Sequence, residues 1–429
     1  MEVRPFRGWR YSLAGGRDVS PFLSPPFDIL TAEDKQQLLS ACDRNAVAVD
    51  LPHVRPRETG PDELYAAAAE RLEHWKRTGV IRQDDRPAIY AYEQTYEWSG
   101  RKRTRRAIIC GVRVTPFGED VIPHERIFPG PLADRLKLTV QTRTQLSPIF
   151  GFYCDSGGRV AELLSARTKE APDVVGALRG VTERLWAITD AEAISSVAAA
   201  VREEPVFIAD GHHRYTTAMK YRDLLAEAGE LNNGHEGNFA MFALVARDDP
   251  GLVVLPAHRV IGSLREGFSV AELAAAAPEF SWQQHEASEA ELAEGGEFAA
   301  RFGPGAMAFV NGRSPTMWVA KLKDPEAMRR AAPREPDQWR ALAPAILQRL
   351  IVERALKPWV QGQPRIEYTP DCRKVLEACR TGRAQLGVCL QAIPVGVVEA
   401  VARGGSAMPH KSTYFYPKLA TGMVFKPVG

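Results

Sequence analysis

The stretch from Val206 to Tyr215 constrains the fold of this chain more than any other part of the sequence. It opens with Val-Phe-Ile-Ala, an apolar run typical of a buried strand, and Asp210-Gly211 is turn chemistry that ends the strand. A polar helix is predicted directly afterwards, from Tyr215 to Ala228. Such a strand–loop–helix junction directs backbone N–H groups and a partial positive charge at one spot, which favours an anion there.

The side chains at this junction fit a site for a phosphorylated small molecule. His212, His213 and Arg214 supply cationic or hydrogen-bonding groups, Gly211 leaves the backbone accessible, and Asp210 adds a carboxylate. A plain structural loop is the alternative, because Asp-Gly is common in turns and adjacent histidines occur on solvated loops. A metal pair is disfavoured, since sequence neighbours seldom aim both imidazoles at one ion and no cysteine lies nearby.

The composition indicates a globular protein with more than one domain. The 429 residues are 45% apolar and 25% charged, so the chain can bury a large core, and we expect two or three domains. The 55 basic and 53 acidic residues nearly balance, so we expect no nucleic-acid partner. The longest apolar run, Phe239 to Ala246, is far shorter than the ~20 residues of a membrane-spanning helix, so we expect no membrane partner.

The cysteines and the first residues favour a cytoplasmic location. The cysteines are scattered without a Cys-x-x-Cys pair, and we expect reduced, mostly structural thiols. They are Cys42, Cys110, Cys154, Cys372, Cys379 and Cys389. The first residues, Met-Glu-Val-Arg-Pro-Phe-Arg, contain no apolar core of a secretory signal.

Strand-like segments alternate with helix-like segments, which predicts an α/β or α+β fold with mixed sheets and helices. We expect an α/β core at 1–265, a variable helical and strand insert with a linker at 266–337, and a helix plus a small α/β region at 338–429. The core would carry the Asp-Gly-His-His-Arg segment, and the C-terminal region the Lys-Ser-Thr segment.

Four local predictions concern turns, a linker and a helix. Arg101 to Arg106 is expected to be the turn of one hairpin, and Asp248 to Gly251 the turn of another. Lys323 to Asp337 is charged and contains prolines, which indicates a surface linker. The apolar periodicity from Trp339 to Leu356 predicts one helix, with Pro344 tolerable only near its start.

Two further segments combine charged side chains with prolines or aromatic residues. His124-Glu125 and Asp134-Arg135 offer a base, acids and an anion clamp in a segment that prolines stiffen; a solvated ion-pair loop is the alternative. Lys411-Ser412-Thr413 can bind phosphate or a carboxylate, and the alternative is a C-terminal strand with a snorkelling lysine. A Walker-type phosphate loop fits poorly, because His410 stands where its second glycine is required.

Two smaller candidates complete the set. Asp28 is presented from a stiff turn that Pro25 and Pro26 fix, and His258-Arg259 follow a strand-like segment. The usual motifs of serine hydrolases, zinc hydrolases and nicotinamide-dependent enzymes are absent from the sequence.

The dense segments together resemble the signature blocks of one bacterial and archaeal family, the domain-of-unknown-function family numbered 1015. The blocks are Arg4-Pro-Phe6, Pro25-Pro-Phe-Asp28, His124-Glu125 with Asp134-Arg135-Leu136, Leu146-Ser-Pro-Ile-Phe150, Asp210-Gly-His-His-Arg-Tyr215, Asp249-Pro-Gly-Leu252, Leu255-Pro-Ala-His-Arg259 and Met408 to Lys418. They run through nearly the whole chain. The departures are Phe27 for the family's Tyr, Ala257 for Thr and His410 for Gln.

Asp210 to Arg214, followed by a helix, is also similar to the signature of the ParB/sulfiredoxin superfamily. This resemblance implies a nucleotide-binding core at the strand–helix junction, with additional α/β regions around it. Members include CTP-dependent DNA-partition proteins, ATP-dependent sulfinic-acid reductases and kinases of free serine. The nearly neutral charge argues against the partition role, and Cys154, the cysteine nearest in sequence, is too remote for the reductase role.

The resemblance and the residues together favour a small-molecule kinase that uses ATP and Mg²⁺, with free serine as the first acceptor. A non-catalytic nucleotide- or metabolite-binding regulator and a ParB-like NTPase are the alternatives. We also expect Asp134, Arg135, His124 and Glu125 to lie around the same cleft as Asp210 to Arg214.

Each candidate residue has an expected role in such a kinase. Glu125 is the expected base, Asp210 would organise Mg²⁺ or the loop, and His212 would assist catalysis. The expected nucleotide- or phosphate-binding residues are Gly211, His213, Arg214, Arg135, Lys411, Ser412 and Thr413. The expected substrate-binding residues are Asp28, His124, His258 and Arg259.

Overall fold

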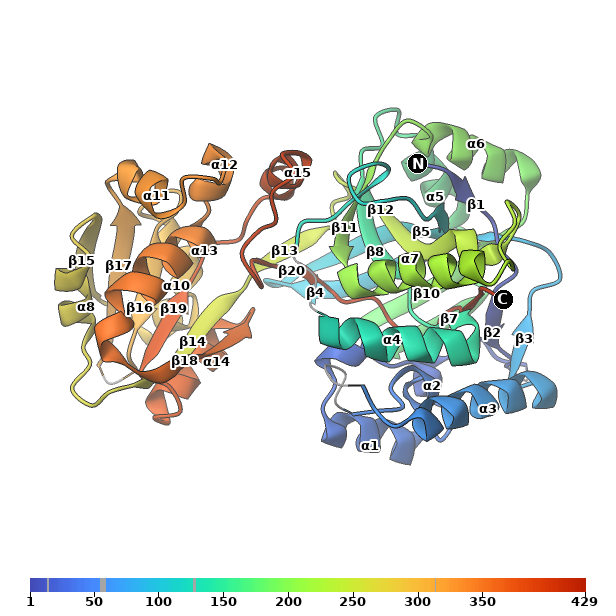
Figure 1. The fold of residues 1–429 in the computed structure, drawn as a ribbon, viewed down its shortest axis with the longest axis horizontal. Helices are drawn as coiled ribbons and strands as arrows, with labels where there is room; N and C mark the ends of the chain where they lie inside the picture. Colours follow the sequence, from blue (N-terminus) through green and yellow to red (C-terminus); the bar gives the residue numbers. More distant parts are fainter. Residues whose placement is uncertain (14, 55–58, 126–128, 313) are drawn as a thin grey trace. The chain divides into compact units, whose positions relative to one another are not determined.

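The computed structural model describes residues 1–429 except 14, 55–58, 126–128 and 313 (Figure 1). The chain forms two compact units. Unit 1 comprises Met1–Pro123, Ile127–Val253 and Pro417–Gly429, and unit 2 comprises His124–Arg126 and Val254–Tyr416. The predicted mixed α/β architecture is confirmed, since both units combine helices with β-sheets. No helix in the described part of the chain is long and apolar enough to cross a membrane.

Unit 1 is built on a mixed sheet of nine strands among the described residues. Its order is β6-β11-β8-β12-β5-β4-β10-β9, and β1 pairs with β5 (Figure 1). The strands are β1 Val3–Arg4, β4 Ile89–Trp98, β5 Arg101–Arg113, β6 Val121–Ile122, β8 Ile149–Tyr153, β9 Val174–Leu178, β10 Val181–Ile188, β11 Val206–Asp210 and β12 Phe239–Ala246. The central strands are almost continuously apolar and buried, as expected for a sheet that is covered on both faces.

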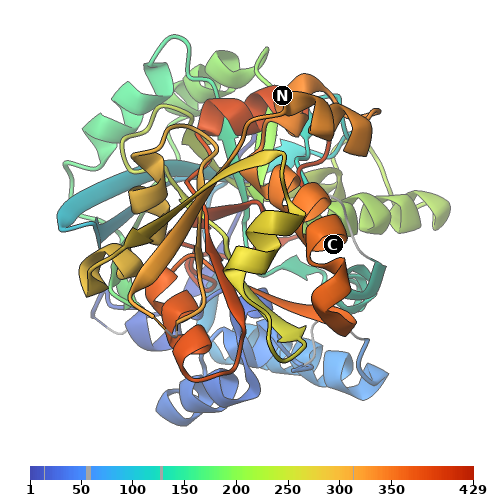
Figure 2. The ribbon, with the colours of Figure 1, turned by 90° about the vertical axis from the view of Figure 1, so that its left-hand side faces the viewer.

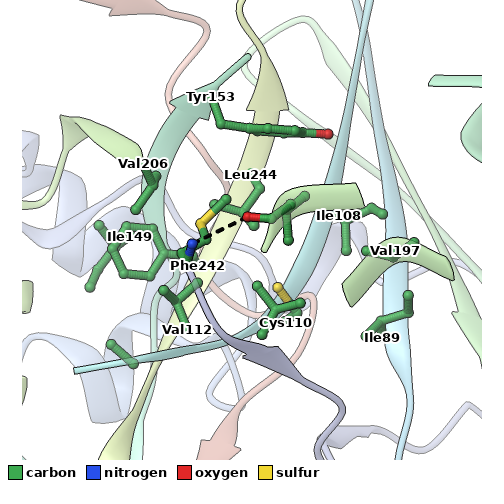
Figure 3. Packing of buried hydrophobic residues seen from close by; sticks show 14 of the residues in the cluster. Ile89, Ile108, Cys110, Val112, Ile149, Tyr153, Val197, Val206, Phe242 and Leu244 are labelled. Atoms are coloured by element: carbon green, nitrogen blue, oxygen red, sulfur yellow. Dashed lines mark hydrogen bonds between the residues drawn. The ribbon is translucent and has the colours of Figure 1, made fainter. Parts of the chain in front are cut away.

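The helices of unit 1 pack beside this sheet. They are α1 Ala32–Ala41, α2 Val47–Asp50, α3 Asp62–Thr78, α4 Pro129–Thr142, α5 Arg159–Arg167, α6 Ala191–Val201 and α7 His212–Glu227. α7 contacts α4, which in turn contacts α3, whereas α5 and α6 contact each other (Figure 1). The core packs side chains of β5, β8 and β12 against Val197 of α6 (Figure 3). Unit 1 also contains two short antiparallel ladders, β2 Trp9–Tyr11 with β3 Ile81–Gln83 and β7 Thr144–Gln145 with β21 Lys426–Pro427.

The strand–loop–helix junction is present, but its helix begins earlier than predicted. β11 ends at Asp210 as expected, and α7 begins at His212 instead of Tyr215. Gly211 makes this possible, because its φ of 97° reverses the chain within one residue. His212, His213 and Arg214 therefore occupy the first turn of α7 rather than a preceding loop.

The structure differs from both predicted hairpin turns. The first turn is Ser99-Gly100, and the Arg101–Arg106 segment belongs to β5, where cross-strand partners on β4 pair with it. The second turn does not form a hairpin, because β12 already has β8 and β5 as its two neighbours. The strand that follows it, β13 Val253–Pro256, pairs with β20 Thr413–Tyr416 instead.

Unit 2 contains a six-stranded sheet in the order β15-β17-β16-β19-β14-β18 (Figure 2). Its strands are β14 His258–Leu264, β15 Phe280–Glu286, β16 Met307–Val310, β17 Thr316–Leu322, β18 Val360–Thr369 and β19 Leu386–Cys389. Its helices are α8 Val270–Ala276, α9 Glu289–Ala293, α10 Gly295–Ala300, α11 Pro325–Ala331, α12 Asp337–Arg340, α13 Ala343–Ile346, η4 Leu347–Ala355, α14 Cys372–Arg380 and α15 Val395–Arg403. Apolar residues of α10, α14, β16 and β19 form its core.

Two predictions for unit 2 need correction. The segment from Lys323 to Asp337 is not only a linker, because Asp324 caps the short helix α11 within it. The single helix from Trp339 to Leu356 is interrupted at Leu342, where the backbone is extended before Pro344 enters the first turn of α13. From Leu347 onward the helix is wound more loosely, with π-type hydrogen bonds.

A buried chain of polar side chains in unit 1 holds the segment 417–420 against the sheet. Arg105 donates to Gln94, Gln94 donates to Glu183 over 3.1 Å, and the Tyr92 hydroxyl donates to Glu183 over 2.6 Å. The same side chains contact the 417–420 backbone. Arg105 donates to the Pro417 carbonyl and Gln94 to that of Lys418, while the Ala420 N–H points to the Tyr92 oxygen.

We predict that Glu183 makes stability decline as pH rises. Burial raises the pKa of its carboxyl from 4.5 to about 7, against the hydrogen bonds from Tyr92 and Gln94. Because the folded pKa is the higher one, the stabilisation is complete below the unfolded pKa and is lost as pH rises from about 4.5 to about 7. The loss from one such group is on the order of 3 kcal/mol.

Urea unfolding at acidic and mildly alkaline pH tests this. Between acidic and mildly alkaline pH, the unfolding free energy of wild type should fall by more than that of Glu183→Gln, which carries no titrating proton at this position. Parallel losses in the two proteins would show that Glu183 titrates normally.

Candidate functional site

Asp210, the last residue of β11, is the anchor of the candidate site in unit 1. Its Oδ2 accepts a hydrogen bond from Arg214 over 2.8 Å, and its Oδ1 accepts one from Lys418 over 2.9 Å. All three side chains are largely buried. The carboxylate therefore fixes two cations that come from α7 and from the C-terminal segment. Sequence reasoning missed Lys418 as a site residue, although it ends a dense polar–aromatic segment.

Gly211 lets the backbone turn directly into α7. Gly211 is the N-cap residue of this sixteen-residue helix, so the position that serine, threonine or aspartate usually occupies brings no side-chain oxygen. A Cβ at Gly211 would lie 2.9 Å from the Arg214 guanidinium. Glycine is thus required both by its φ and by the close approach of Arg214. The predicted strand–glycine–helix junction is confirmed, and the binding of an anion there stays a prediction.

A pocket lies beside this junction and is lined only by residues of unit 1. Its charged lining residues are Asp50, Arg135 and Arg214, and its polar lining includes Ser147, Gln145 and Thr217. The volume is about 40 Å³. That is room for roughly three water molecules, and so for a phosphate-sized group rather than a whole nucleotide. Arg135 and Arg214 both line this pocket, and the expectation that His124 and Glu125 of unit 2 share the same cleft stays a prediction.

Asp50, at the end of α2, is the residue of this pocket that sequence reasoning missed. Its carboxylate is buried, accepts a hydrogen bond from the Ser147 hydroxyl over 3.1 Å and lies 3.5 Å from Arg135 Nη1. Burial raises the pKa of Asp50, and the negative charge of Asp28 adds to this, while Arg135 and Arg214 oppose it. The available signal was a single acid inside the apolar run Ala46 to Leu51.

Arg135 of α4 is held between two acids of unit 1. Its Nε donates to Asp134 over 2.7 Å, and its Nη1 donates to the Asp50 carbonyl over 2.6 Å. Asp134 also accepts a hydrogen bond from the Tyr65 hydroxyl, and Phe27 stacks under the guanidinium. In the described part of the chain, Nη2 makes no well-oriented hydrogen bond, although it lies 2.6 Å from Asp134. That buried N–H group can serve a ligand oxygen.

The other predicted residues of unit 1 lie at or near the same place. Asp28 is exposed in the short 3₁₀ turn Phe27–Ile29, and its charge reaches Asp50. His212 and His213 are in the first turn of α7, where their carbonyls accept from the hydroxyls of Thr216 and Thr217. These contacts involve the backbone of the two histidines, and the roles predicted for their imidazoles stay predictions.

Unit 2 brings together two of its own predicted residues. His124 is buried with its Nε2 3.2 Å from the Thr413 hydroxyl, and its carbonyl accepts from the Met408 N–H. Ser412 donates to the Pro409 carbonyl, and Lys411 has a left-handed φ of 53°. Glu125 belongs to the same unit. The roles predicted for these residues stay predictions.

His258 and Arg259 on β14 are buried within unit 2 and point to different partners. The His258 ring lies against Cys372, whereas the Arg259 guanidinium stacks on Tyr368 and donates to the Ala257 carbonyl. Burial lowers the pKa of Arg259 to about 10. Neither residue lines the pocket of unit 1.

We predict that Gly211→Ala destabilises the protein more than a matched glycine substitution does. Gly229, just after α7, also has a positive φ, but a Cβ there would meet nothing within 4 Å. Both alanines carry the left-handed backbone cost, and only the one at 211 displaces Arg214 from Asp210. We expect an extra loss of about 1 to 2 kcal/mol in chemical denaturation. Equal losses for the two variants would mean that Arg214 moves aside freely.

Comparisons with known proteins identify the family. A family model described as a protein of unknown function (DUF1015) matches residues 3–329. No curated protein matches the chain.

Solved structures that match include a free serine kinase variant in complex with AMP, at 14% identity and TM-score 0.35, covering 72% of this chain and 87% of the other. A conserved hypothetical protein from Pyrococcus furiosus matches at 12% identity and TM-score 0.33, covering 72% and 90%. SbnI with a C-terminal truncation, from Staphylococcus aureus, matches at 11% identity and TM-score 0.35, covering 75% and 87%. Such distant likenesses assign no activity. By the family model, the chain belongs to the DUF1015 family.

Proposed function

We propose that this protein is an ATP-dependent phosphotransferase that acts on the hydroxyl group of a small metabolite. The observation that carries the proposal is the pocket of unit 1, where Asp50, Arg135 and Arg214 meet beside the amino end of α7. Phosphoryl transfer requires positioned cations and a proton acceptor near the hydroxyl, and these residues supply both. Free serine is the first acceptor to test, because the Asp-Gly-His-His-Arg segment resembles a superfamily that includes free-serine kinases.

The start of α7 would hold a phosphate group of the nucleotide. The amino end of α7 favours an anion, and Arg214 and the Nη2 of Arg135 offer charge-assisted hydrogen bonds. Asp210 and Lys418 would keep Arg214 oriented. His212 and His213, at the same turn, are further candidates for phosphate contact and catalysis.

Asp50 is the base that the pocket offers. A carboxyl whose pKa burial raises is a better proton acceptor near neutral pH than an ordinary aspartate. Its Oδ2 accepts a hydrogen bond from Ser147 and its Oδ1 lies 3.5 Å from Arg135 Nη1, so both oxygens face polar residues that line the pocket. Glu125, the base expected from sequence, belongs to unit 2 and is the competing candidate.

Mg²⁺ would enter with the nucleotide rather than occupy a protein site of its own. Both oxygens of Asp210 face cationic side chains, which suits Asp210 to orienting the loop. Mg²⁺ commonly binds through substrate phosphates with one or two carboxylates. In unit 2, the candidates for nucleotide contact remain Lys411, Ser412 and Thr413, and those for substrate contact remain His124, His258 and Arg259. In unit 1, Asp28 remains a candidate for substrate contact, and its negative charge raises the pKa of Asp50.

We predict that Asp50→Asn loses phosphotransfer without losing stability. The substitution keeps the shape and removes the proton acceptor, so the rate should fall by roughly two to four orders of magnitude. Burial disfavours the charged carboxylate, whereas the amide also gives up the ion pair with Arg135, so we expect these effects to offset and the variant to stay close to wild type in stability at neutral pH. The measurement is ATP-dependent phosphorylation of serine and of a panel of hydroxylated metabolites, followed by mass spectrometry.

Glu125→Gln is the matched comparison for this experiment. It should retain activity if Asp50 is the base. A full rate for Asp50→Asn with a collapsed rate for Glu125→Gln would transfer the role to Glu125. If wild type phosphorylates no hydroxylated metabolite but binds nucleotide, the protein is a binding regulator and the kinase proposal is wrong.

We predict that Arg214→Ala weakens nucleotide binding by more than about 1 kcal/mol, because it removes a charge-assisted phosphate contact. Lys220→Ala is the control, since Lys220 is an exposed cation on the same helix outside the pocket. Isothermal calorimetry with ATP and Mg²⁺ measures both. Equal affinities in the two variants, with the fold intact by circular dichroism, would remove Arg214 from the site.

A DNA-binding assay across a salt series addresses the ParB-like alternative. Phosphate contacts with DNA produce a steep fall of affinity with salt. We expect no specific binding and no effect of DNA on ATP turnover.

A further inference from the structure

Three buried side chains of unit 2 form a cluster that the proposed function does not use. His258 begins β14, Cys372 begins α14 and Cys389 ends β19, and their ligand atoms all lie within 4.8 Å of one another. The Cys372 sulfur is 3.2 Å from His258 Nε2. α10 packs on the cluster through Gly295, where a Cβ would lie 3.1 Å from the Cys389 sulfur.

The backbone fixes the position of the proton on His258. The Leu390 N–H donates to His258 Nδ1 over 3.0 Å, so Nδ1 presents its lone pair. The ring then carries its proton on Nε2, which faces Cys372 and donates to its sulfur. A second histidine proton at Nδ1 would collide with the Leu390 N–H.

Cys372 is arranged as a thiolate and Cys389 as a thiol. The Cys372 sulfur also accepts hydrogen bonds from the Cys389 side chain and from the Gly296 backbone. The Cys389 hydrogen bond, followed by that of His258, lowers the pKa of Cys372 to about 5 against the effect of burial. The pKa of Cys389 is raised by its neighbour Cys372 and by burial. Cys372 is 6% exposed and Cys389 is fully buried.

This arrangement is a poor fit to a metal ion. A metal at the cluster would take the Nε2 lone pair, which requires the ring proton to sit on Nδ1, where the Leu390 N–H already points. Structural zinc also takes four ligands, and the cluster provides three among the described residues. Thiol chemistry uses the same contacts without this conflict.

We propose that Cys372 and Cys389 are a redox-active cysteine pair, in which Cys372 reacts with a peroxide and Cys389 closes a disulfide, with His258 as the positioning residue. The Cys372 thiolate would attack the O–O bond of hydrogen peroxide, forming a sulfenic acid and releasing water after one proton is taken from solvent. The Cys389 sulfur would then displace the sulfenic hydroxyl, which leaves as water with the Cys389 proton. Two sulfurs are oxidised to one disulfide and one peroxide is reduced to two waters. A small dithiol then reduces the disulfide back to the two cysteines and is itself oxidised to a cyclic disulfide.

The test uses the reduced, full-length protein, titrated with hydrogen peroxide and analysed by intact mass and peptide mapping. We expect a loss of about two mass units, a cross-linked pair of peptides carrying Cys372 and Cys389, and full reversal by dithiothreitol. Cys379→Ser is the matched control, because Cys379 lies on the same helix, is buried and has its pKa raised to about 11 by burial. This variant should form the disulfide as wild type does.

Two further variants separate the steps. The Cys389→Ser variant should stop at a sulfenic acid on Cys372, which dimedone traps. The His258→Asn variant should slow the oxidation of Cys372 at least tenfold at neutral pH, while its melting temperature stays close to that of Cys379→Ser. A disulfide that involves another cysteine, or no oxidation of Cys372 in the wild type at peroxide levels that oxidise free cysteine, would overturn the proposal. So would one equivalent of zinc in the purified protein that is released when thiols are blocked, since that outcome assigns the cluster to a metal.

Discussion

The carboxylate of Asp210, held between Arg214 and Lys418, is the interaction on which the candidate site depends. It joins the junction of β11 and α7 to the C-terminal segment, which lies about two hundred residues further along the chain. Because the three side chains are largely buried, the ion pairs are weakly screened and their geometry is defined. Removing one partner would leave a charge with incomplete compensation, so the group acts as a unit.

The buried polar side chains around Glu183 hold Lys418 in position for its contact with Asp210. Arg105 and Gln94 bind the backbone of Pro417 and Lys418, which places the Lys418 ammonium at Asp210. Buried polar groups of this kind are costly unless every member is paired, and here each link is satisfied by the next. The arrangement explains why a segment near the C-terminus contributes to a site on a sheet formed mainly by the first half of the chain.

The sequence could predict the strand–glycine–helix junction, because apolar strands and Asp-Gly turns are local signals. It could not predict that α7 begins at His212, since that depends on the φ of Gly211. The failed hairpin after β12 has a tertiary cause, because both edges of that strand are already paired. Asp50 and Lys418 were missed for a similar reason: their importance comes from neighbours that lie about a hundred or more residues away.

A crystal structure of the protein with a non-hydrolysable ATP analogue and Mg²⁺ tests the central claim most directly. The account predicts that a phosphate group of the analogue lies at the first turn of α7, within hydrogen-bond distance of Arg214, with Asp50 facing the space where an acceptor hydroxyl would sit. An analogue bound elsewhere, with the pocket beside α7 filled only by water, would contradict it.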